Sequence, residues 1–286
     1  MAHTTGELAT SRSAARHNLP MAISSFSNHT IPSIRAAGTS LNPSVLHALQ
    51  LYTMRDRVLQ LSLIRAAEQN GCKALFLTAD SPVLGVRYNE WRNDFRTPAG
   101  LEFPLLGLTT QMLRSRSHDE GFVAFNSDAH SWAREIPWLR SVTRMEIWVK
   151  GVLTAEDAEA AVRASCDGVV VSNHGGRQLD RVVATLDALP EVVGAVKGRC
   201  GIHVDGGVRS GTDVFIALAL GAEMVWVGRP VLWGLAYNGE KGVDAMLECF
   251  ESEFRRCMQL CGCTSVKEIT KASLGLLRGD GPLARL

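Results

Sequence analysis

Short apolar runs that alternate with amphipathic helical segments constrain this chain more than any other feature of its sequence. The helical segments carry boundary signals: Ser210 and Asp213 have the spacing of a capping box, and Gly221 follows the same helix. Arg55–Asn70 is predicted to be another such helix. This alternation predicts a parallel sheet covered by helices on its outer face. The seven runs that we predict to be buried strands are Met21–Ser24, Ala48–Tyr52, Ala74–Asp80, Ile147–Lys150, Gly168–Ser172, Ile202–Asp205 and Met224–Val227.

Polar residues at the carboxyl ends of these strands favour a barrel over an open doubly wound sheet. An open sheet gathers its ligands at one switch point, whereas a barrel collects a residue from nearly every strand. Five of the predicted strands end in such residues, namely Tyr52, Asp80, Lys150, Ser172 and Asp205. The sequence therefore predicts one α/β domain over residues 1–286, a TIM (β/α)8 barrel that lacks its first strand.

Three segments depart from the strand–helix rhythm. Residues 1–20 have no apolar core of a secretory leader and predict a helix. Residues 88–131 contain several prolines and glycines without a clear period, which predicts a long lid loop. Residues 239–286 are predicted to form C-terminal helices, Val243–Leu260 and Val266–Ala272, that pack outside the barrel.

Composition and charge exclude several classes of function. The net charge is +1 and no basic run is longer than a few residues, so nothing supports a nucleic-acid or membrane-surface partner. The seven cysteines are scattered and odd in number, which favours a reducing compartment over a disulfide framework. Cys261 and Cys263 suggest a metal clip, but no second ligand pair lies near them in the sequence, and we predict no metal site.

The segment SNHGGRQLD, residues 172–180, carries the strongest chemical signal. A buried strand leads to His174 and Arg177 on a turn that Gly175 and Gly176 loosen. An imidazole suits proton abstraction because its pKa lies near neutrality, and a guanidinium can hold a carboxylate at two points. A solvated surface turn with an incidental histidine is the alternative.

A lysine and two glycine-rich loops point to an anionic ligand. Lys150 ends an apolar strand, where an ammonium group needs a partner. Asp205 is followed by two glycines and Arg209, and one strand later Gly228 precedes Arg229. Loops of this kind after the last two strands of a barrel are typical phosphate-binding sites.

These motifs identify a family resemblance that covers nearly the whole chain. SNHGGRQLD, DGGVRSGTDVFIALALGA, VKGVLTAEDA and LTADSPVLGVR resemble the FMN-dependent enzymes that oxidise 2-hydroxy acids, among them glycolate oxidase, lactate oxidase and mandelate dehydrogenase. The resemblance implies FMN as cofactor and oxidation of a small L-2-hydroxy acid, similar to lactate or glycolate, to the 2-oxo acid. It does not distinguish an oxidase from a dehydrogenase. It also implies a homotetramer.

The resemblance assigns a role to each matching residue. His174 would be the base, oriented by Asp80, and Lys150 would stabilise negative charge on the reduced flavin. The substrate carboxylate would be held by Tyr52, Arg87 and Arg177. The flavin ring and ribityl chain would be contacted by Ser24, Gln50, Thr78, Lys150, Ser172 and Asp205. The phosphate would be surrounded by Gly206, Gly207, Val208, Arg209, Gly228 and Arg229.

The chain also departs from the family pattern. Phe26 stands where glycolate oxidases carry a tryptophan, which alters the expected substrate pocket. His203 shares a face with Asp205, and we interpret it as a packed core histidine in preference to a second catalytic group. Family members have a further N-terminal segment that holds the first strand. Without it, two strand edges are unpaired, and we expect low stability and weak FMN binding.

Two other functions remain open at this point. One is a catalytically impaired relative without flavin that acts as a binding protein. The other is a different phosphate-binding barrel enzyme, which leaves the His-Gly-Gly-Arg turn unexplained. The C-terminal tripeptide Ala284-Arg285-Leu286 resembles the peroxisomal Ser-Lys-Leu address, so we expect a peroxisomal location, with the cytoplasm as the alternative.

Overall fold

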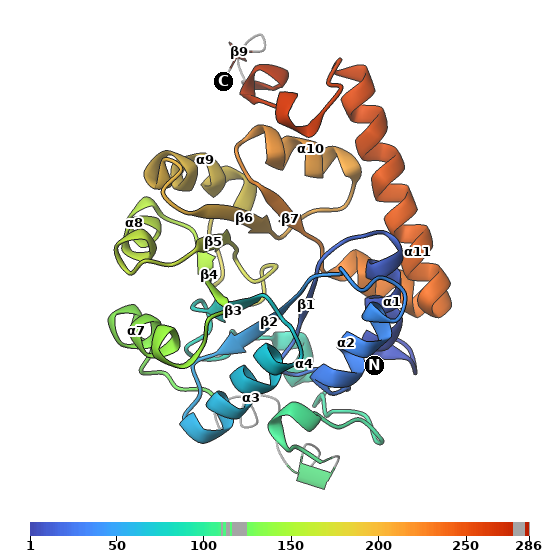
Figure 1. The fold of residues 1–286 in the computed structure, drawn as a ribbon, viewed down its shortest axis with the longest axis vertical. Coiled ribbons are helices and arrows are strands. Elements are labelled where there is room, and N and C mark those ends of the chain that lie inside the picture. The colour runs from blue at the N-terminus through green and yellow to red at the C-terminus, as the bar shows by residue number, and fades with distance from the viewer. Residues whose placement is uncertain (110, 113–114, 116–124, 277–283, 286) are drawn as a thin grey trace.

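The computed structural model of the chain describes residues 1–109, 111–112, 115, 125–276 and 284–285. Seven parallel strands form one curled sheet whose order follows the chain, with helices around its outer face (Figure 1). All seven predicted strands are present, and each end lies within two residues of its predicted position. The strands are β1 Met21–Ile23, β2 His47–Tyr52, β3 Ala74–Thr78, β4 Glu146–Val152, β5 Gly168–Val171, β6 Gly201–Asp205 and β7 Met224–Trp226. The predicted barrel without one of its strands is therefore confirmed.

Eight helices of nine residues or more are present among the described residues, and most follow a strand. They are α1 Gly6–Arg16, α2 Ile31–Thr39, α3 Arg57–Gln69, α7 Trp132–Val142, α8 Ala155–Arg163, α9 Thr185–Val196, α10 Gly211–Ala219 and α11 Arg229–Leu260. The predicted boundary signals act as expected: Ser210 and Asp213 form a reciprocal capping box on α10, and Gly71 adopts a positive φ after α3. No helix in the described ranges is both long and apolar enough to cross a bilayer.

The strands are apolar on both faces because both are buried. Leu75, Leu77 and their neighbours on adjacent strands pack against the outer helices, whereas Phe76, Trp148 and Val170 form a separate cluster inside the barrel. Successive side chains of a strand point to opposite faces, so burial of both faces produces a continuous apolar run. This explains why the strands appear in the sequence as short apolar runs and not as an alternation of apolar and polar residues.

One row of residues across the sheet shows how the inside of the barrel is filled. Phe76 pairs with Trp148, which pairs with Gly168, which in turn pairs with Gly201. The Trp148 ring occupies the space over the two glycines: a Cβ built on Gly168 would lie 2.1 Å from Trp148 Cζ3, and one on Gly201 would lie 2.4 Å from Trp148 Cη2. His203 stacks on the same indole, with ring centroids 3.8 Å apart.

The interpretation of His203 as a packed core histidine agrees with its surroundings. Burial lowers the pKa of His203 to about 4, so its imidazole is neutral at physiological pH. Trp226 Nε1 donates a hydrogen bond to His203 Nδ1 at 3.2 Å, which requires the other ring nitrogen to carry the proton. A neutral imidazole with this fixed tautomer fills space between two indole rings.

The sheet does not close on itself within the described residues. β1 pairs only with β2 and β7 only with β6, and we call these two unpaired edges the seam. All three residues of β7 are half-buried, whereas β3 is buried throughout. Helix α1 precedes β1 in the chain and helix α11 follows β7. These two helices pack against each other (Figure 1). Arg12 and Arg16 of α1 form ion pairs with Glu240, and Arg16 also pairs with Asp244.

The predicted C-terminal helices are partly wrong. Val243–Leu260 is the second part of the longer α11, which begins at Arg229 and has non-helical dihedrals at Asn238 and Gly239. Val266–Ala272 is not an α-helix but two 3-10 turns, η2 Val266–Glu268 and η3 Lys271–Ser273. The chain becomes extended at Ile269, whose side chain is buried against Phe215 and Ala219 of α10, so the helical turn that begins at Val266 does not continue.

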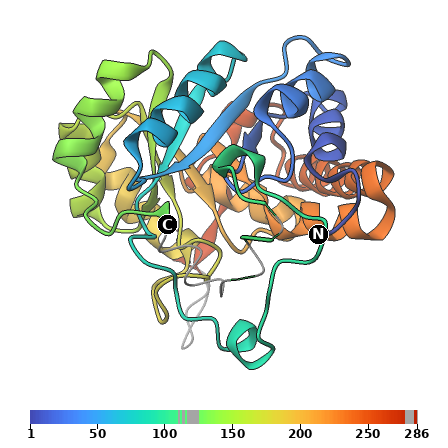
Figure 2. The ribbon, with the colours of Figure 1, turned by 90° about the horizontal axis from the view of Figure 1, so that it is seen from below.

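The segment predicted as a lid lies outside the ring of strands. Figure 2 shows the described residues that follow β3 in a segment that extends beyond the body of the barrel. It contains the short helix α4 Tyr88–Arg92 and the 3-10 turn η1 Pro104–Leu106. Separately, near the C-terminus, β8 Gly275–Leu276 pairs with β9 Ala284–Arg285. Most of the polar run SRSHDEG, residues 115–121, lies outside the described residues, as does Leu286.

We expect Gly168→Ala to destabilise the protein by about 1–3 kcal/mol, because the added methyl group meets a rigid indole in a packed interior. Urea unfolding followed by circular dichroism measures the change. Gly194→Ala is the matched control: Gly194 lies in α9 with open space around it, so we expect a gain of about 0.5–1 kcal/mol. Equal stability of the Gly168 variant and the wild type would contradict this account of the interior.

Candidate active site

A lysine lies between two carboxylates at the carboxyl ends of four neighbouring strands. Lys150 Nζ is 3.5 Å from Asp205 Oδ2 at the end of β6 and 3.9 Å from Asp80 Oδ2 after β3. It donates a hydrogen bond to Ser172 Oγ after β5, at 2.9 Å. All three charged side chains are less than a fifth exposed. A cation with so little access to water depends on its carboxylate partners.

The histidine and the same aspartate form the second part of this network. His174 Nδ1 lies 2.7 Å from Asp80 Oδ1, and Ser81 Oγ donates to that oxygen at 2.9 Å. Burial acts to raise the pKa of Asp80, but the His174 hydrogen bond and the positive charge of Lys150 outweigh it and hold the pKa below its usual value. Because an ionised carboxylate only accepts hydrogen bonds, Nδ1 carries a proton in this contact, and in the neutral imidazole the lone pair is on Nε2.

The local backbone places these groups through unusual conformations. His174 has a φ of 58°, a left-handed conformation that is uncommon outside glycine, and Gly175 and Gly176 follow with positive φ. The His174 amide donates to Ser172 Oγ, which steadies the turn. On the opposite side, β4 has an irregularity at Gly151, where a Cβ would lie 2.6 Å from Asp80 Cβ. Only a glycine leaves room for the aspartate there.

Two arginines and a tyrosine lie beside this network. Arg87 and Arg177 share the Glu90 carboxylate, at 3.4 Å and 3.7 Å. Burial and the nearby charge of Arg87 lower the pKa of Arg177. Burial and the charge of Asp80 raise the pKa of Tyr52, while the two guanidinium groups act in the opposite direction. Arg87, Arg177 and Tyr52 therefore lie within electrostatic range of one another and of Asp80. The two guanidinium groups and the hydroxyl group make this a place suited to an anion.

The predicted phosphate-binding residues occupy the loops after β6 and β7. Gly206 and Gly207 have φ values of 93° and 79°, and a Cβ on Gly207 or Gly228 would meet no atom. Arg209 stacks on the Trp233 ring at 4.8 Å. Arg229 donates to the Gly175 carbonyl at 2.7 Å, next to the catalytic candidate His174. Val208 is buried. The space above these glycines is open, with two guanidinium groups nearby.

The remaining predicted residues lie at the ends of β1 to β3. Gln50 donates to Thr78 Oγ1 at 2.9 Å, and its side-chain oxygen accepts from the Ser25 amide at 3.3 Å. Ser24 is exposed, and its hydroxyl accepts from the Phe26 amide. The Phe26 ring contacts Tyr52 edge to face, with centroids 5.9 Å apart, so the altered family position lies next to the tyrosine.

Sequence reasoning missed several residues that hold this site together. Ser81, Glu90, Gln178 and Ser25 each bond directly to a predicted site residue or to its backbone. Ser81 and Gln178 lie within two of the motifs that carry the family resemblance, and this location is the one feature of the sequence that could have indicated their roles. Glu90 lies in a segment without a clear pattern, and nothing in the sequence singles it out.

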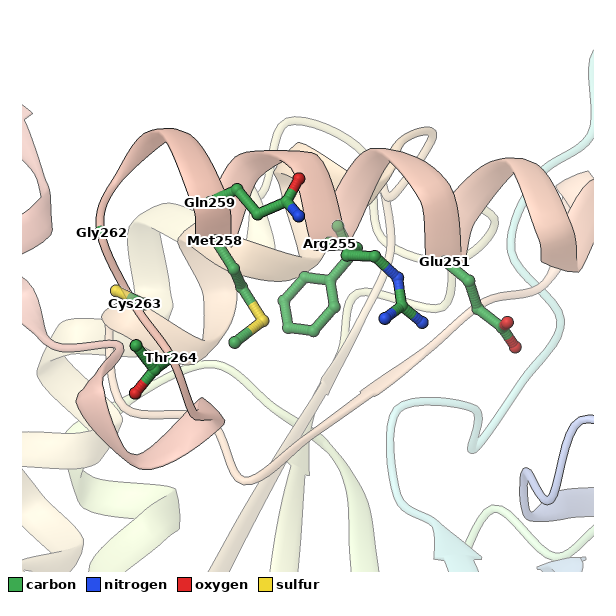
Figure 3. Close-up of a pocket in the computed structure, with 8 residues that line it drawn as sticks. Glu251, Arg255, Met258, Gln259, Gly262, Cys263 and Thr264 are labelled. Atoms are coloured by element: carbon green, nitrogen blue, oxygen red, sulfur yellow. The ribbon is translucent and has the colours of Figure 1, made fainter.

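Two other features of the described residues lie apart from this network. No group of three or more His, Cys, Asp or Glu side chains with metal-binding geometry is present in the described part of the chain. A hollow on the outer surface follows the C-terminal end of α11, and Figure 3 shows the side chains around it. It is lined by Glu251, Phe254, Arg255, Met258, Gln259, Gly262, Cys263 and Thr264, none of which belongs to the strand-end network.

We expect Lys150→Met to destabilise the protein by about 2–3 kcal/mol at neutral pH, because it leaves two poorly hydrated carboxylates without a cation. The wild-type Asp80 has a lowered pKa, so its stabilising effect is present at neutral pH and is lost as the pH falls through that pKa. The difference between variant and wild type should therefore be constant from pH 8 to about pH 5 and should shrink only below the ordinary aspartate pKa of about 3.9 in chemical denaturation. Lys267→Met, at an exposed lysine in η2, should show neither effect.

Known proteins are similar to this chain in both sequence and structure. The family model described as FMN-dependent dehydrogenase matches residues 1–276. The chain is 45% identical to 2-hydroxyacid oxidase 1 of Homo sapiens over 278 residues, which covers 95% of the chain and 74% of that protein. It is 41% identical to L-lactate oxidase of Nostoc sp. over 283 residues, which covers 96% and 76%.

Among solved structures, a crystal structure of mandelate oxidase matches with a TM-score of 0.81 and 38% identity, covering 93% of this chain and 72% of the other. Together with the family match over nearly the whole length, this structural match shows that the chain belongs to the FMN-dependent dehydrogenase family.

Proposed function

We propose that this chain uses FMN to oxidise a small L-2-hydroxy acid to the corresponding 2-oxo acid. One observation carries the proposal: the Asp80 carboxylate bonds His174 with one oxygen and lies near Lys150 with the other, beside a pair of arginines. A base, a fixed cation and a carboxylate-binding group are the three parts that this oxidation needs, and they lie together at one end of the barrel. The family and its 2-hydroxyacid oxidase relatives support the same reaction.

The residues at the strand ends fit FMN. Asp205 Oδ1 is buried without a hydrogen-bond partner among the described residues, as expected for an acceptor that serves a ligand hydroxyl group. The open space above Gly207 and Gly228 and the nearby Arg209 and Arg229 suit a phosphate. In this proposal Ser24, Gln50, Thr78, Lys150 and Ser172 contact the ring system, and Gly206 and Val208 complete the phosphate loop.

FMN supplies the acceptor for the two electrons that leave the substrate. His174 Nε2 would take up one hydrogen of the CH–OH group as a proton, because this ring nitrogen is free of the Asp80 contact, and the second hydrogen and both electrons would pass to the bound FMN. Asp80 keeps the proton of the other ring nitrogen in place and stabilises the imidazolium that forms. Lys150 would hold a positive charge beside the bound FMN, where it would stabilise negative charge on the reduced cofactor.

The other end of the substrate is held by charge and by hydrogen bonding. Arg177 and Arg87 would bind the carboxylate, with Tyr52 as an additional donor. Phe26 contacts Tyr52, and its ring also contacts Phe103 edge to face at 5.5 Å, so the substrate side chain would meet aromatic carbon. This favours a substrate with an apolar group on the α-carbon, such as lactate, over glycolate.

A second candidate function follows from the seam. The half-buried β7 and its unpaired edge leave part of the barrel interior accessible, which favours an impaired relative that binds FMN weakly and acts as a binding protein. The two candidates make opposite predictions for the isolated chain.

We expect the purified chain to bind added FMN, with a flavin absorption band that bleaches anaerobically on addition of L-lactate. His174→Gln should keep the band and lower the rate of bleaching by about 10²–10⁴-fold, the usual contribution of a positioned base. His17→Gln, at a histidine of the α1 end that pairs with α11, is the matched control and should bleach at the wild-type rate. A folded protein that no added FMN colours would support the binding-protein alternative.

Three further aspects of the protein are proposals of the same kind. We propose that residues 1–286 act as one domain, that the protein assembles as a homotetramer, and that Ala284-Arg285-Leu286 directs it to the peroxisome, with the cytoplasm as the alternative.

We expect a fluorescent reporter that carries the C-terminal segment to colocalise with a peroxisomal marker in yeast or plant cells. The same reporter without the last three residues should be diffuse in the cytoplasm, because receptor-read addresses of this kind depend on the terminal tripeptide. A diffuse signal from both reporters would favour the cytoplasmic location.

A further inference from the structure

One glutamine side chain joins the two loops that carry the catalytic candidates. Gln178 Nε2 donates to the Asp80 carbonyl at 3.1 Å and to the Val83 carbonyl at 2.8 Å. Gln178 Oε1 accepts from the Gly85 amide at 3.0 Å. Two carbonyl acceptors and one amide donor match the side-chain amide in a single orientation. The half-buried side chain of Gln178 therefore bonds one loop at three points.

A glycine brings the same two loops into direct backbone contact. A Cβ built on Gly85 would lie 2.5 Å from the Arg177 carbonyl oxygen and 2.6 Å from Gln178 Cα. The φ of Gly85 is not positive, so its backbone conformation is open to other residues and only the missing side chain is required. The distance between the loops is thus set by close packing as well as by hydrogen bonds.

Each loop contributes one half of two functional pairs. Residues 80–87 carry Asp80, which orients the base, and Arg87. Residues 174–178 carry the base His174 and Arg177. A change in the spacing between the loops therefore alters the base and its orienting carboxylate together with the pair of arginines.

We infer that Gln178 and Gly85 form an interloop clamp that positions the base and the carboxylate-binding arginines as one unit. The inference rests on the proposed function, and it assigns a role to two residues that do not touch the reacting atoms. Displacement of catalytic groups by about 1 Å can reduce a rate by on the order of 10²-fold. A clamp of this kind acts on turnover and on substrate binding together.

Three variants separate the parts of the clamp. Gln178→Met keeps the length of the side chain and loses all three hydrogen bonds. Gln178→Glu keeps the acceptor for the Gly85 amide, loses both donors, and turns a carboxylate oxygen toward the Asp80 and Val83 carbonyls. Gly85→Ala keeps every polar group and adds only a methyl group. Gln69→Met, at the exposed end of α3, and Gly194→Ala, in α9, are the matched controls.

Amide hydrogen exchange measures the clamp without any need for turnover. We expect Gln178→Met to accelerate exchange of the Gly85 amide by about tenfold, because the one hydrogen bond that this amide donates to the side chain is lost. Gly85→Ala should accelerate exchange in residues 80–85 to a similar degree, about tenfold, because the added methyl group forces the two loops apart. The controls should exchange at the wild-type rate there. Unchanged protection of this segment in both variants would overturn the inference.

Steady-state kinetics of the FMN-loaded protein provide the second measurement. We expect Gln178→Met and Gly85→Ala to lower kcat by about 10–100-fold and to raise KM several-fold for L-lactate, at unchanged FMN occupancy. A merely structural role predicts lower thermal stability and lower occupancy, with normal kcat and KM in the loaded fraction, and that result would also overturn the inference. If the wild type binds FMN but does not oxidise any 2-hydroxy acid, the proposed function fails, and hydrogen exchange still decides the clamp.

Discussion

The contact of the Asp80 carboxylate with both His174 and Lys150 is the interaction on which the candidate site depends. It keeps the imidazole in one tautomer, and it compensates a cation that has little access to water. The contact needs room, which Gly151 provides, and a fixed spacing between two loops, which Gln178 and Gly85 provide. The chemistry therefore depends on close backbone packing around one carboxyl group.

The barrel interior and the site follow different rules. The interior is filled by indole and imidazole rings over glycines, so its stability depends on shape and on burial of apolar surface. The strand ends hold charges that balance one another, so their arrangement depends on electrostatics. Both meet on the same strands: Trp148 and Lys150 lie two residues apart on β4 and point to the same side of it. The seam bears on the interior and on the site, because β7 is half-buried at its unpaired edge and ends next to the phosphate loop.

Much of this arrangement could be predicted from the sequence. Apolar blocks with capping signals located all seven strands to within two residues, because burial on both faces leaves an unbroken apolar run. The resemblance located the residues that the structure brings together at the strand ends. The error at 266–272 arose because Ile269 is extended and buried against Phe215 and Ala219 of α10, a tertiary contact that apolar periodicity does not report. Helical periodicity also did not reveal the break at Asn238 and Gly239.

The sequence by itself determined the order of strands and helices, the α/β class, and which residue types stand at the strand ends, because these depend on local propensity and on burial patterns. Only the tertiary structure decided which groups share a partner. Glu90 bridges two arginines, Ser81 supports Asp80, and Gln178 spans two loops nearly a hundred positions apart in the chain. A hydrogen bond requires atoms within about 3 Å, and a linear pattern holds no information on distances between remote segments.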